Sequence, residues 1–532
     1  MFVKASSRRL NLRVKIWITA SLQLMTCAAL HLSSSSSFSS STPEDLLTVM
    51  KTSRQPRIVV VGAGVAGLGA ATRLKELGFT DLTVVEASDT VGGRVAKSKI
   101  GKVWVDTGAQ YIHGASVENP IYCLLNTSGL LSQVPPDEGS TVYYRRDGQR
   151  LSEDLADRVY EAGEGIFRQR GNNSGRSLGE HFAEAAQAFV EGWQAEEKKS
   201  VQGVLALVGK DYLINIAASD LHRVSVDSWQ YYTNMGDDLN VEGCMFQMVE
   251  KLAEDVPKER LLLNKAVSKI EWDGSFSGTD SQVYPVRVLC GDGGEILADH
   301  VIVTVSLGCL KAQAASLFSP SLPAEKMEVI DKLSFGNIAK IFLEYEEAFW
   351  ESDVSRISLI WDDDSVESVS TNKTQWLKHV SLFTVMKPQE RFGNILIGWC
   401  PGDVADLIET MTEEELSSAI TEHLRIFTGN LNIPPPKSVL QTRWRRNNFT
   451  RGSYTYIPVG VDGQVMDVLA QPLVGIKNPS KDLQVLFSGE ATIKTQYSTV
   501  QGALLSGHRD AERLAQLYGR TAPPAVHCNN HT

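Results

Sequence analysis

The sequence predicts an α/β fold that opens with a β–α–β unit close to residue 58. Residues 58–61 are four consecutive β-branched residues, and residues 82–85 form a second, largely apolar run. The alanine-rich stretch between them has helical spacing and is closed by Gly78. Continuous apolar runs of this length favour strands that are buried on both faces. Two such runs joined by a helix are typical of a parallel sheet covered by helices.

A glycine motif joins the first predicted strand to the helix, and an acid ends the second strand. Gly62 permits a tight turn, Gly64 lets backbone N–H groups approach a pyrophosphate, and Gly67 lets helix and strand pack closely. The helix N-terminus, with Ala66, would face the phosphates, and Glu86 can accept hydrogen bonds from ribose hydroxyls. A purely structural turn is the alternative. The complete strand, turn, helix and strand context favours a dinucleotide site.

The next segment distinguishes flavin from nicotinamide. Gly92, Gly93 and Arg94 follow the second strand, and residues 106–110 read Asp-Thr-Gly-Ala-Gln. A double glycine lets the main chain pass close to a bulky ligand, and Arg94 offers a forked cation to a phosphate, although alone it would be a solvated loop residue. With the first glycine motif, these residues resemble the FAD-dependent amine oxidase family. No second nucleotide motif follows, so nothing suggests a separate NAD(P)H site.

The resemblance covers most of residues 56–516 and returns near the C-terminus. Residues 486–492 are similar to the closing strand and flavin loop of the family, and residues 497–507 open a last helix. The N-terminus of that helix, placed under the flavin pyrimidine, would stabilise negative charge on the reduced ring. In the family a valine equivalent to Val267 touches the adenine.

The resemblance implies FAD bound without a covalent link, because monoamine oxidases carry their flavin-linking cysteine where this chain has Ser453. The residues expected to bind the cofactor are Gly62, Gly64, Ala66, Gly67, Glu86, Arg94, Gly108, Ala109, Val267, Trp444, Glu490, Thr499 and Val500.

Two residues are the candidates for catalysis. Residues 322–350, which contain Lys340, resemble the polyamine oxidases in particular. The nearest branch of that group is the animal enzymes that act on N1-acetylpolyamine or spermine. The resemblance implies that Lys340 holds a water against flavin N5; a solvated strand lysine is the alternative. It also implies that His113 faces the substrate amine and hydrogen-bonds the reacting nitrogen. A histidine with a purely structural role remains the alternative.

The predicted chemistry needs an uncharged amine, because a protonated ammonium does not readily release a hydride from its α-carbon. Deprotonating an alkylammonium with a pKa of ~10.4 at pH 7 costs on the order of 4–5 kcal/mol. An apolar, aromatic cavity lowers that pKa by desolvation. Tyr454 matches an aromatic that flanks the substrate in the family, while Thr499, with Tyr497 nearby, stands where monoamine oxidases place a second tyrosine.

Composition sets limits on partners. The whole chain carries a net charge of −11, and residues 1–43 carry +5, so the remaining residues carry −16. This acidity argues against nucleic-acid binding and suits a cationic small substrate, although solubility alone explains the same charge. The seven cysteines show no metal-binding spacing, so no metal site is expected. The oligomeric state stays open.

Residues 1–43 differ in composition from the rest of the chain. They hold five basic residues, no acid, a moderately apolar stretch and a serine tract. This pattern favours a secretory leader, with a mitochondrial presequence, a membrane anchor or disorder as alternatives. The body has no run of membrane-spanning length, so no stable membrane span is expected once the leader is removed. Cytoplasmic and peroxisomal locations remain open. Sequons stand at Asn126, Asn172, Asn372, Asn448 and Asn530.

The predicted architecture is a Rossmann-like FAD-binding domain interleaved with an α+β substrate-binding domain. Helices are expected in residues 176–222 and 413–427, and strands in residues 335–400. The expected divisions are a leader (1–43), an FAD-binding domain (56–118, 240–325 and 440–516), a substrate-binding domain (119–239 and 326–439) and a tail (517–532).

The resemblance implies an FAD-dependent polyamine oxidase. It would oxidise a C–N bond of an N1-acetylpolyamine, spermine or spermidine by hydride transfer, with O2 as acceptor, and give H2O2, an aminoaldehyde and a shorter amine. An oxidase of another amine is one alternative. A non-catalytic or chromatin-regulatory protein similar to the lysine-specific histone demethylases is the other.

Overall fold

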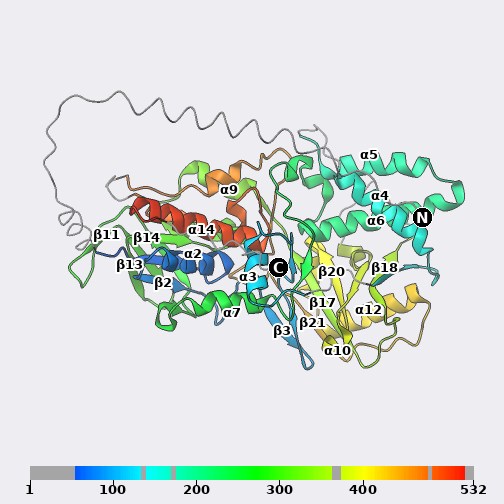
Figure 1. Ribbon diagram of the computed structural model, residues 1–532. Coiled ribbons are helices and arrows are strands. Elements are labelled where there is room, and N and C mark those ends of the chain that lie inside the picture. Colours follow the sequence, from blue (N-terminus) through cyan, green and yellow to red (C-terminus); the bar gives the residue numbers. More distant parts are fainter. Residues whose placement is uncertain (1–53, 133–138, 169–174, 362–372, 477–481, 522–532) are drawn as a thin grey trace, which may run out of the picture. The chain divides into compact units, whose positions relative to one another are not determined.

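The computed structural model describes residues 54–132, 139–168, 175–361, 373–476 and 482–521 (Figure 1). The predicted leader, most of the predicted tail and the sequons at Asn172, Asn372 and Asn530 lie outside the described residues.

A five-stranded parallel sheet contains the predicted β–α–β unit. Its strand order is β23 (Val485–Phe487), β14 (His300–Val303), β1 (Ile58–Val61), β2 (Leu82–Val85) and β8 (Leu261–Leu262). Because successive side chains of a strand alternate between faces, Ile58 and Val60 enter one hydrophobic core while Val59 and Val61 enter another. Both faces of the sheet are therefore covered, as the continuous apolar runs predict.

Helices α2 (Val65–Glu76) and α14 (Val500–Leu517) pack against each other over one face of this sheet (Figure 1). Small residues permit the approach: a Cβ at Gly507 would lie 2.2 Å from the Ala66 carbonyl oxygen. The last helix of the chain is thus fixed against the helix that carries the glycine motif.

A four-stranded sheet and helix α8 (Leu307–Leu317) pack on the opposite face, and their apolar residues share a core with Val59 and Val61. The order of this sheet is β13 (Glu295–Ala298), β12 (Val286–Cys290), β9 (Val267–Glu271) and β15 (Phe318–Ser319).

A six-stranded sheet forms the other major layer. Its order is β21 (Ser438–Gln441), β17 (Ile338–Tyr345), β20 (Asn394–Pro401), β19 (Leu382–Val385), β18 (Val354–Ile360) and β6 (Ser140–Arg145). One hydrophobic core joins it to α4 (Glu153–Arg168), α5 (Leu178–Glu191) and α6 (Ala195–Ile216), and a second joins it to α11 (Gly402–Ile408) and α12 (Glu413–Thr428).

The local predictions for this region are confirmed. Helix α12 begins at Thr412 with a capping box completed by Glu415, and α5 begins with the same motif at Ser177 and Glu180. The strands predicted for residues 335–400 are β17 to β20.

The remaining helices are α3 (Pro120–Thr127), α7 (Phe246–Glu254), α9 (Ala324–Lys332), α10 (Gln389–Phe392) and α13 (Val465–Leu469), and the short strands are β3 (Lys97–Ile100), β4 (Val103–Asp106), β5 (Tyr111–Ile112), β7 (Leu239–Asn240), β10 (Phe276–Ser277), β11 (Val283–Tyr284), β16 (Ser334–Phe335) and β22 (Thr455–Tyr456). Within the described ranges, none of the helices has both the length and the apolar character needed to cross a bilayer.

Candidate functional site

One cavity of about 1160 Å³ receives nearly all of the residues that the sequence singles out. It is lined by Gly62, Gly64, Ala66, Glu86, Arg94, Gly108, Ala109, His113, Val267, Lys340, Trp444, Tyr454, Glu490, Tyr497, Thr499 and Val500. Gly67 does not line the cavity. A Cβ at Gly67 would lie 1.9 Å from the Gly62 carbonyl oxygen, so its role is the close packing of helix on strand that the motif predicts.

The N-terminus of α2 opens onto this cavity. No side chain caps Gly64, the N-cap residue, and the first turn holds no acid. The N–H groups of that turn therefore remain for an anion. A Cβ at Gly64 would meet only the Gly92 carbonyl oxygen, at 3.9 Å, so the protein's own packing does not require glycine there. The space in front of Gly64 is what a close pyrophosphate needs, and the residues present fit a dinucleotide.

Glu86 follows β2 and is 7% exposed. Its Oε2 accepts a hydrogen bond from the Ala63 N–H at 2.7 Å, and its Oε1 accepts one from the Ser88 N–H at 2.9 Å. The carboxylate thus fixes the glycine turn. The Ser88 hydroxyl also donates to Oε1, at 2.5 Å, so of about four acceptor positions on the carboxylate one remains for a ribose hydroxyl.

Arg94 and Glu490 both line the cavity, but they bind each other. Arg94 Nη1 donates to Glu490 Oε1 at 2.7 Å and to the Ser453 carbonyl oxygen at 2.8 Å. Glu490 also accepts hydrogen bonds from the Thr455 hydroxyl at 3.2 Å and the Ser498 N–H at 3.1 Å. The guanidinium that the sequence assigns to a phosphate is therefore neutralised by a carboxylate that lies 396 residues away in the chain.

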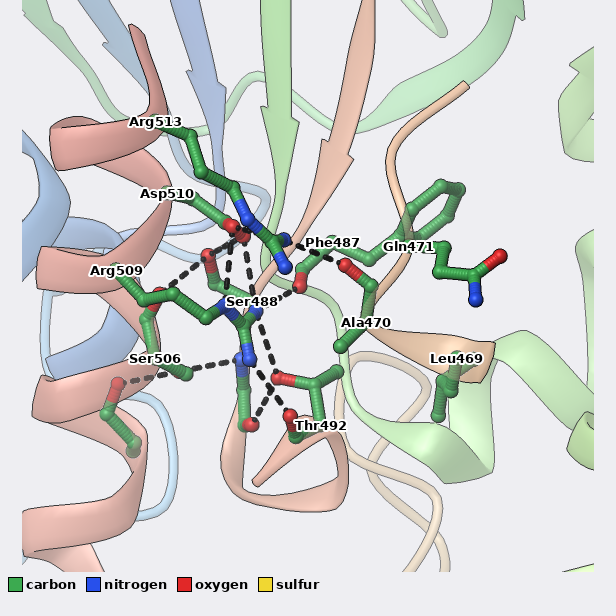
Figure 2. Close-up of polar contacts among 12 residues, drawn as sticks. Leu469, Ala470, Gln471, Phe487, Ser488, Thr492, Ser506, Arg509, Asp510 and Arg513 are labelled. Atoms are coloured by element: carbon green, nitrogen blue, oxygen red, sulfur yellow. Dashed lines mark hydrogen bonds and ion pairs between the residues drawn. The ribbon is translucent and has the colours of Figure 1, made fainter. Parts of the chain in front are cut away.

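A buried carboxylate holds the loop that carries Glu490. Asp510 on α14 is fully buried and accepts hydrogen bonds from the Ser488 hydroxyl, at 2.7 Å, and from the guanidinium groups of Arg509 and Arg513, at 3.0 and 2.8 Å (Figure 2). Arg509 in turn donates to the carbonyl oxygens at both ends of the loop, those of Phe487 at 2.6 Å and Thr492 at 2.7 Å. This network ties the loop to the last helix.

Lys340 projects from β17 into the cavity wall and is 4% exposed. Its Nζ donates to the carbonyl oxygens of Asp106 at 3.0 Å and Gly108 at 2.7 Å and to the Gln110 side chain, and it lies 4.8 Å from the centre of the Trp399 ring. Burial lowers the pKa of Lys340 to about 7, although the Asp106 carboxylate opposes this shift. The lysine is therefore able to exchange a proton near neutral pH.

Asp106 ends β4 beside this lysine. Burial raises the pKa of Asp106 to about 6, and the Met245 N–H, which donates to Oδ2 at 3.0 Å, favours the charged form. The other oxygen, Oδ1, is buried without a hydrogen-bond partner. The two groups form a buried acid and base pair at the cavity wall.

His113 lies on the loop after β5 and is half exposed at the cavity. Its Nδ1 is 2.9 Å from Asp238 Oδ2, and because a carboxylate only accepts, Nδ1 carries the hydrogen in this contact. The Nε2 atom is then the free acceptor. The Gln501 side chain donates to the His113 carbonyl oxygen at 2.9 Å and fixes the loop to α14.

The predicted aromatic wall is present, but its hydroxyls are used by the protein. The hydroxyl of Tyr454 donates to the Ile214 carbonyl oxygen at 2.9 Å, and that of Tyr497 donates to the Ser228 carbonyl oxygen at 3.0 Å. Burial raises the pKa of both phenols. Both tyrosines therefore offer their rings, not a proton, to the cavity. Thr499 caps α14, accepting from the Gly502 N–H at 3.0 Å.

Ser453 is buried, and its hydroxyl is hydrogen-bonded within the protein. It donates to Asn337 Oδ1 at 3.1 Å and accepts from the Ile338 N–H at 2.9 Å. The position that is a flavin-linking cysteine in monoamine oxidases is thus a structural contact between β17 and the loop before Tyr454.

Sequence reasoning missed several cavity residues: Asp238, Trp229, Tyr232, Trp399, Tyr160, Asp211 and Arg356. Trp229 and Tyr232 pack on Tyr497, with ring centres 6.0 and 5.9 Å away. No local pattern marks any of them. Asp238 lies next to His113 only because β7, which follows Asp238, pairs with β5, which precedes His113.

The chain matches known proteins along most of its length. The model of the family described as flavin containing amine oxidoreductase matches residues 65–515. The chain is 36% identical over 494 residues to the peroxisomal N(1)-acetyl-spermine/spermidine oxidase of Bos taurus, covering 87% of this chain and 96% of the bovine protein. The Homo sapiens protein of the same name is 36% identical over 490 residues, with 87% and 95% covered.

A solved structure has the same fold. It is a putrescine oxidase with redesigned cofactor binding, with a TM-score of 0.63 at 20% sequence identity, covering 87% of this chain and 99% of that chain.

Proposed function

The chain belongs to the flavin containing amine oxidoreductase family, and from this premise we propose that it is a polyamine oxidase. The predictions of the amine oxidase fold, of an enzyme and of FAD as the cofactor are confirmed by the family match. The proposal adds the substrate, a polyamine or its N1-acetylated form, and O2 as the electron acceptor. Its support is that both mammalian relatives are named N(1)-acetyl-spermine/spermidine oxidases.

One observation carries the proposal: a single cavity joins the uncapped N-terminus of α2 to Lys340, His113 and a wall of aromatic rings. A dinucleotide held at Gly64 and an amine held among the rings would then share one space. When bound, FAD supplies the oxidation, accepting a hydride from the carbon beside the amine nitrogen and passing the electrons to O2 to give H2O2. Water hydrolyses the imine that remains to an aminoaldehyde and a shorter amine.

The chain's own residues prepare the amine. The rings of Tyr454, Tyr497 and Trp399 exclude water, so a substrate ammonium placed there loses solvation and its pKa falls. We propose that His113 Nε2 accepts a hydrogen bond or a proton from the reacting nitrogen, because Nδ1 is already bound to Asp238. Lys340 is the second group able to exchange a proton, through its buried contacts with Gly108 and Gln110.

The test is the colour of the purified holoenzyme. We expect an oxidised-flavin spectrum that N1-acetylspermine or spermine bleaches in the absence of oxygen, and that benzylamine or a methylated histone peptide leaves unchanged. Bleaching by benzylamine or the peptide alone would replace the proposal with an oxidase of another amine or a demethylase. A colourless protein that binds no added FAD would exclude an active oxidase. Release of the flavin on denaturation would establish that it is non-covalent, as Ser453 suggests.

We also propose the domain divisions given above. All five strands of the parallel sheet fall in residues 56–118, 240–325 and 440–516, and most of the six-stranded sheet falls in residues 119–239 and 326–439. Limited proteolysis with and without FAD would test them, because FAD should protect the first set of segments selectively.

For the compartment, we propose the peroxisome over the secretory path. The support is that both mammalian relatives are named peroxisomal. Imaging of the full chain with an internal fluorescent tag, beside a peroxisomal marker and a secretory marker, would decide between the two locations.

A further inference from the structure

Three polar side chains on one wall of the cavity have no role in the chemistry described above. They are Tyr160 from α4, Asp211 from α6 and Arg356 from β18, and all three line the same cavity as Lys340. Arg356 Nη2 forms an ion pair with Asp211 Oδ2. The Tyr160 hydroxyl donates to the same carboxylate oxygen at 2.8 Å, and Arg356 Nη2 donates to that hydroxyl at 3.1 Å. We call these three residues the Arg356 cluster.

The register of the six-stranded sheet places the Arg356 cluster relative to Lys340. Lys340 on β17 pairs with Trp399 on β20, and Arg356 on β18 pairs with Thr384 on β19. Thr384 pairs with Ile397, two residues from Trp399, and the Trp399 indole donates to the Thr384 hydroxyl at 3.1 Å, so the four side chains form a diagonal row across adjacent strands. All four line the cavity. Three strand spacings of nearly 5 Å and an offset of two residues along the strand put Arg356 about 16 Å from Lys340. A substrate of spermine length can span that distance.

The Arg356 cluster retains one unused acceptor and one unused donor. Asp211 Oδ1 and Arg356 Nε are both buried without a hydrogen-bond partner, whereas nearly all buried polar atoms in folded proteins have one. Asp211 is 6% exposed, and the Arg356 side chain is 19% exposed. A ligand that places both an N–H and a C=O on this wall would complete the cluster.

Charge decides which ligand group fits. Arg356 and Asp211 neutralise each other, and Glu164, the other acid on this wall, pairs with Arg168 at 2.5 Å. An ammonium end has three donors and no acceptor, so it would leave the Arg356 Nε–H unpaired and bring a cation beside a guanidinium. A secondary amide has one N–H and one C=O and no charge. Its N–H complements Asp211, and its C=O complements Arg356.

We propose that the Arg356 cluster binds an acylated, uncharged end of the substrate through its amide group. This inference rests on the proposed function and deepens it, because it selects acylated polyamines over free ones. It makes Arg356 and Asp211 specificity-determining residues that lie away from the reacting nitrogen.

The test compares two symmetric substrates of the holoenzyme, so that both ends of each molecule are alike. N1,N12-diacetylspermine has neutral amide ends, and N1,N12-diethylspermine has charged ends of similar size. We expect the wild-type enzyme to have at least a tenfold higher kcat/KM for the diacetyl compound. In Arg356→Met that ratio should fall at least tenfold, through a higher KM for the diacetyl compound, while its kcat stays within about threefold because the group is distant from the reacting bond.

Two further variants keep the proposal falsifiable. Tyr160→Phe preserves packing and removes only the hydroxyl that orients both charges, so it should lower the ratio by about two- to fivefold. Arg158→Met removes an arginine from the same helix that does not line the cavity and should change both substrates equally. If Arg356→Met folds poorly, Tyr160→Phe and Arg356→Lys carry the test, and Arg356→Lys should also lower the ratio because lysine lacks the planar fork.

The outcomes separate the two proposals. If neither substrate bleaches the flavin and free spermine also fails, the proposed function falls. If both substrates are oxidised and Arg356→Met and Tyr160→Phe leave the ratio unchanged, or lower both values equally, the amide site is excluded while the polyamine oxidase assignment stands.

Discussion

The chain buries two lysines in nearly the same chemical surroundings, and the comparison separates structure from function. Lys340 and Lys326 each place an ammonium group against three oxygen acceptors and the face of an aromatic ring. Burial lowers the pKa of each to about 7. By burial and pKa alone, the two residues are equal candidates for a catalytic role.

Their surroundings differ in access to the cavity. Lys326 donates to the carbonyl oxygens of Val468 and Leu469, the last residues of α13, and of Gln471 at 2.7–2.8 Å (Figure 2 shows Leu469 and Gln471). It therefore donates to carbonyl groups at a helix C-terminus, of which that of Val468 also accepts from the Gln471 N–H at 3.2 Å, and it does not line the cavity. Lys340 does line it. A perturbed pKa becomes evidence of chemistry only where a ligand can reach the group.

The largest expected difference is in activity. Replacing Lys340 with Met should lower kcat for N1-acetylspermine by about 10²–10³, because a proton-exchanging group at the cavity is lost. The matched variant Lys326→Met should stay within about threefold of the wild type when both are compared as FAD-loaded protein at equal flavin absorbance. Equal losses in the two variants would mean that Lys340, like Lys326, serves the fold.

The stabilities should show the reverse order. Lys326→Met removes a donor from three carbonyl groups, of which only that of Val468 keeps a backbone donor, the Gln471 N–H, and should lower the free energy of unfolding by about 2–4 kcal/mol. Lys340→Met should cost about half as much, because cavity water can reach the carbonyl oxygen of Gly108 and the amide of Gln110. Urea unfolding of the two holoenzyme variants measures this difference. A more destabilised Lys340→Met would contradict it.

Two glycines of the same motif should differ in the same way. Gly67→Ala places a Cβ 1.9 Å from the Gly62 carbonyl oxygen and should destabilise the protein by about 1–3 kcal/mol even without FAD. Gly64→Ala meets no atom closer than 3.9 Å, so it should leave the apoprotein unchanged and weaken FAD binding. Apoprotein melting and flavin titration separate the two effects. A destabilised Gly64→Ala apoprotein would show that the fold itself, and not the bound cofactor, requires glycine at this position.

The last expected difference is in the pH dependence of stability. Lys326 has a pKa of about 7 in the folded protein and ~10.4 in the unfolded chain. At pH values between these two, the lysine therefore loses its proton when the protein folds. The unfolded state then binds more protons, so stability rises with pH between about 7 and ~10.4 and does not change with this group below about 7. Replacing Lys326 with Met should lower this slope by at most ~1.4 kcal/mol per pH unit between pH 7 and 9. Identical slopes in urea unfolding of variant and wild type would argue that Lys326 stays charged.

Much of the cofactor-binding part of the site could be predicted from the sequence, because its motifs are formed by residues close together in the chain. The strand, glycine turn, helix and acid lie within residues 58–86, and the spacing of the glycines follows from a turn and a close helix. Lys340 was also accessible, since a lysine within a continuous apolar strand must either be satisfied or act. The structure adds that its acceptors are Gly108 and Gln110, from the loop after β4.

The pairing of side chains from distant segments could not be predicted from the sequence. Arg94, which is predicted to contact a phosphate, also binds Glu490, and Asp238 reaches His113 only through the pairing of β5 with β7. Each partner alone is an ordinary exposed or loop residue in the sequence.

The sequence by itself therefore determined the parallel α/β unit, the dinucleotide turn, the family and the candidate base and lysine. Those features depend on residues close in the chain, where backbone geometry dictates residue type. Only the tertiary structure decided that Lys326 is structural, that Arg94 is already neutralised, and that Asp211 and Arg356 meet on the cavity wall. Ion pairs and cavity access depend on distances between segments that strand order and packing bring together, and no local spacing records those distances.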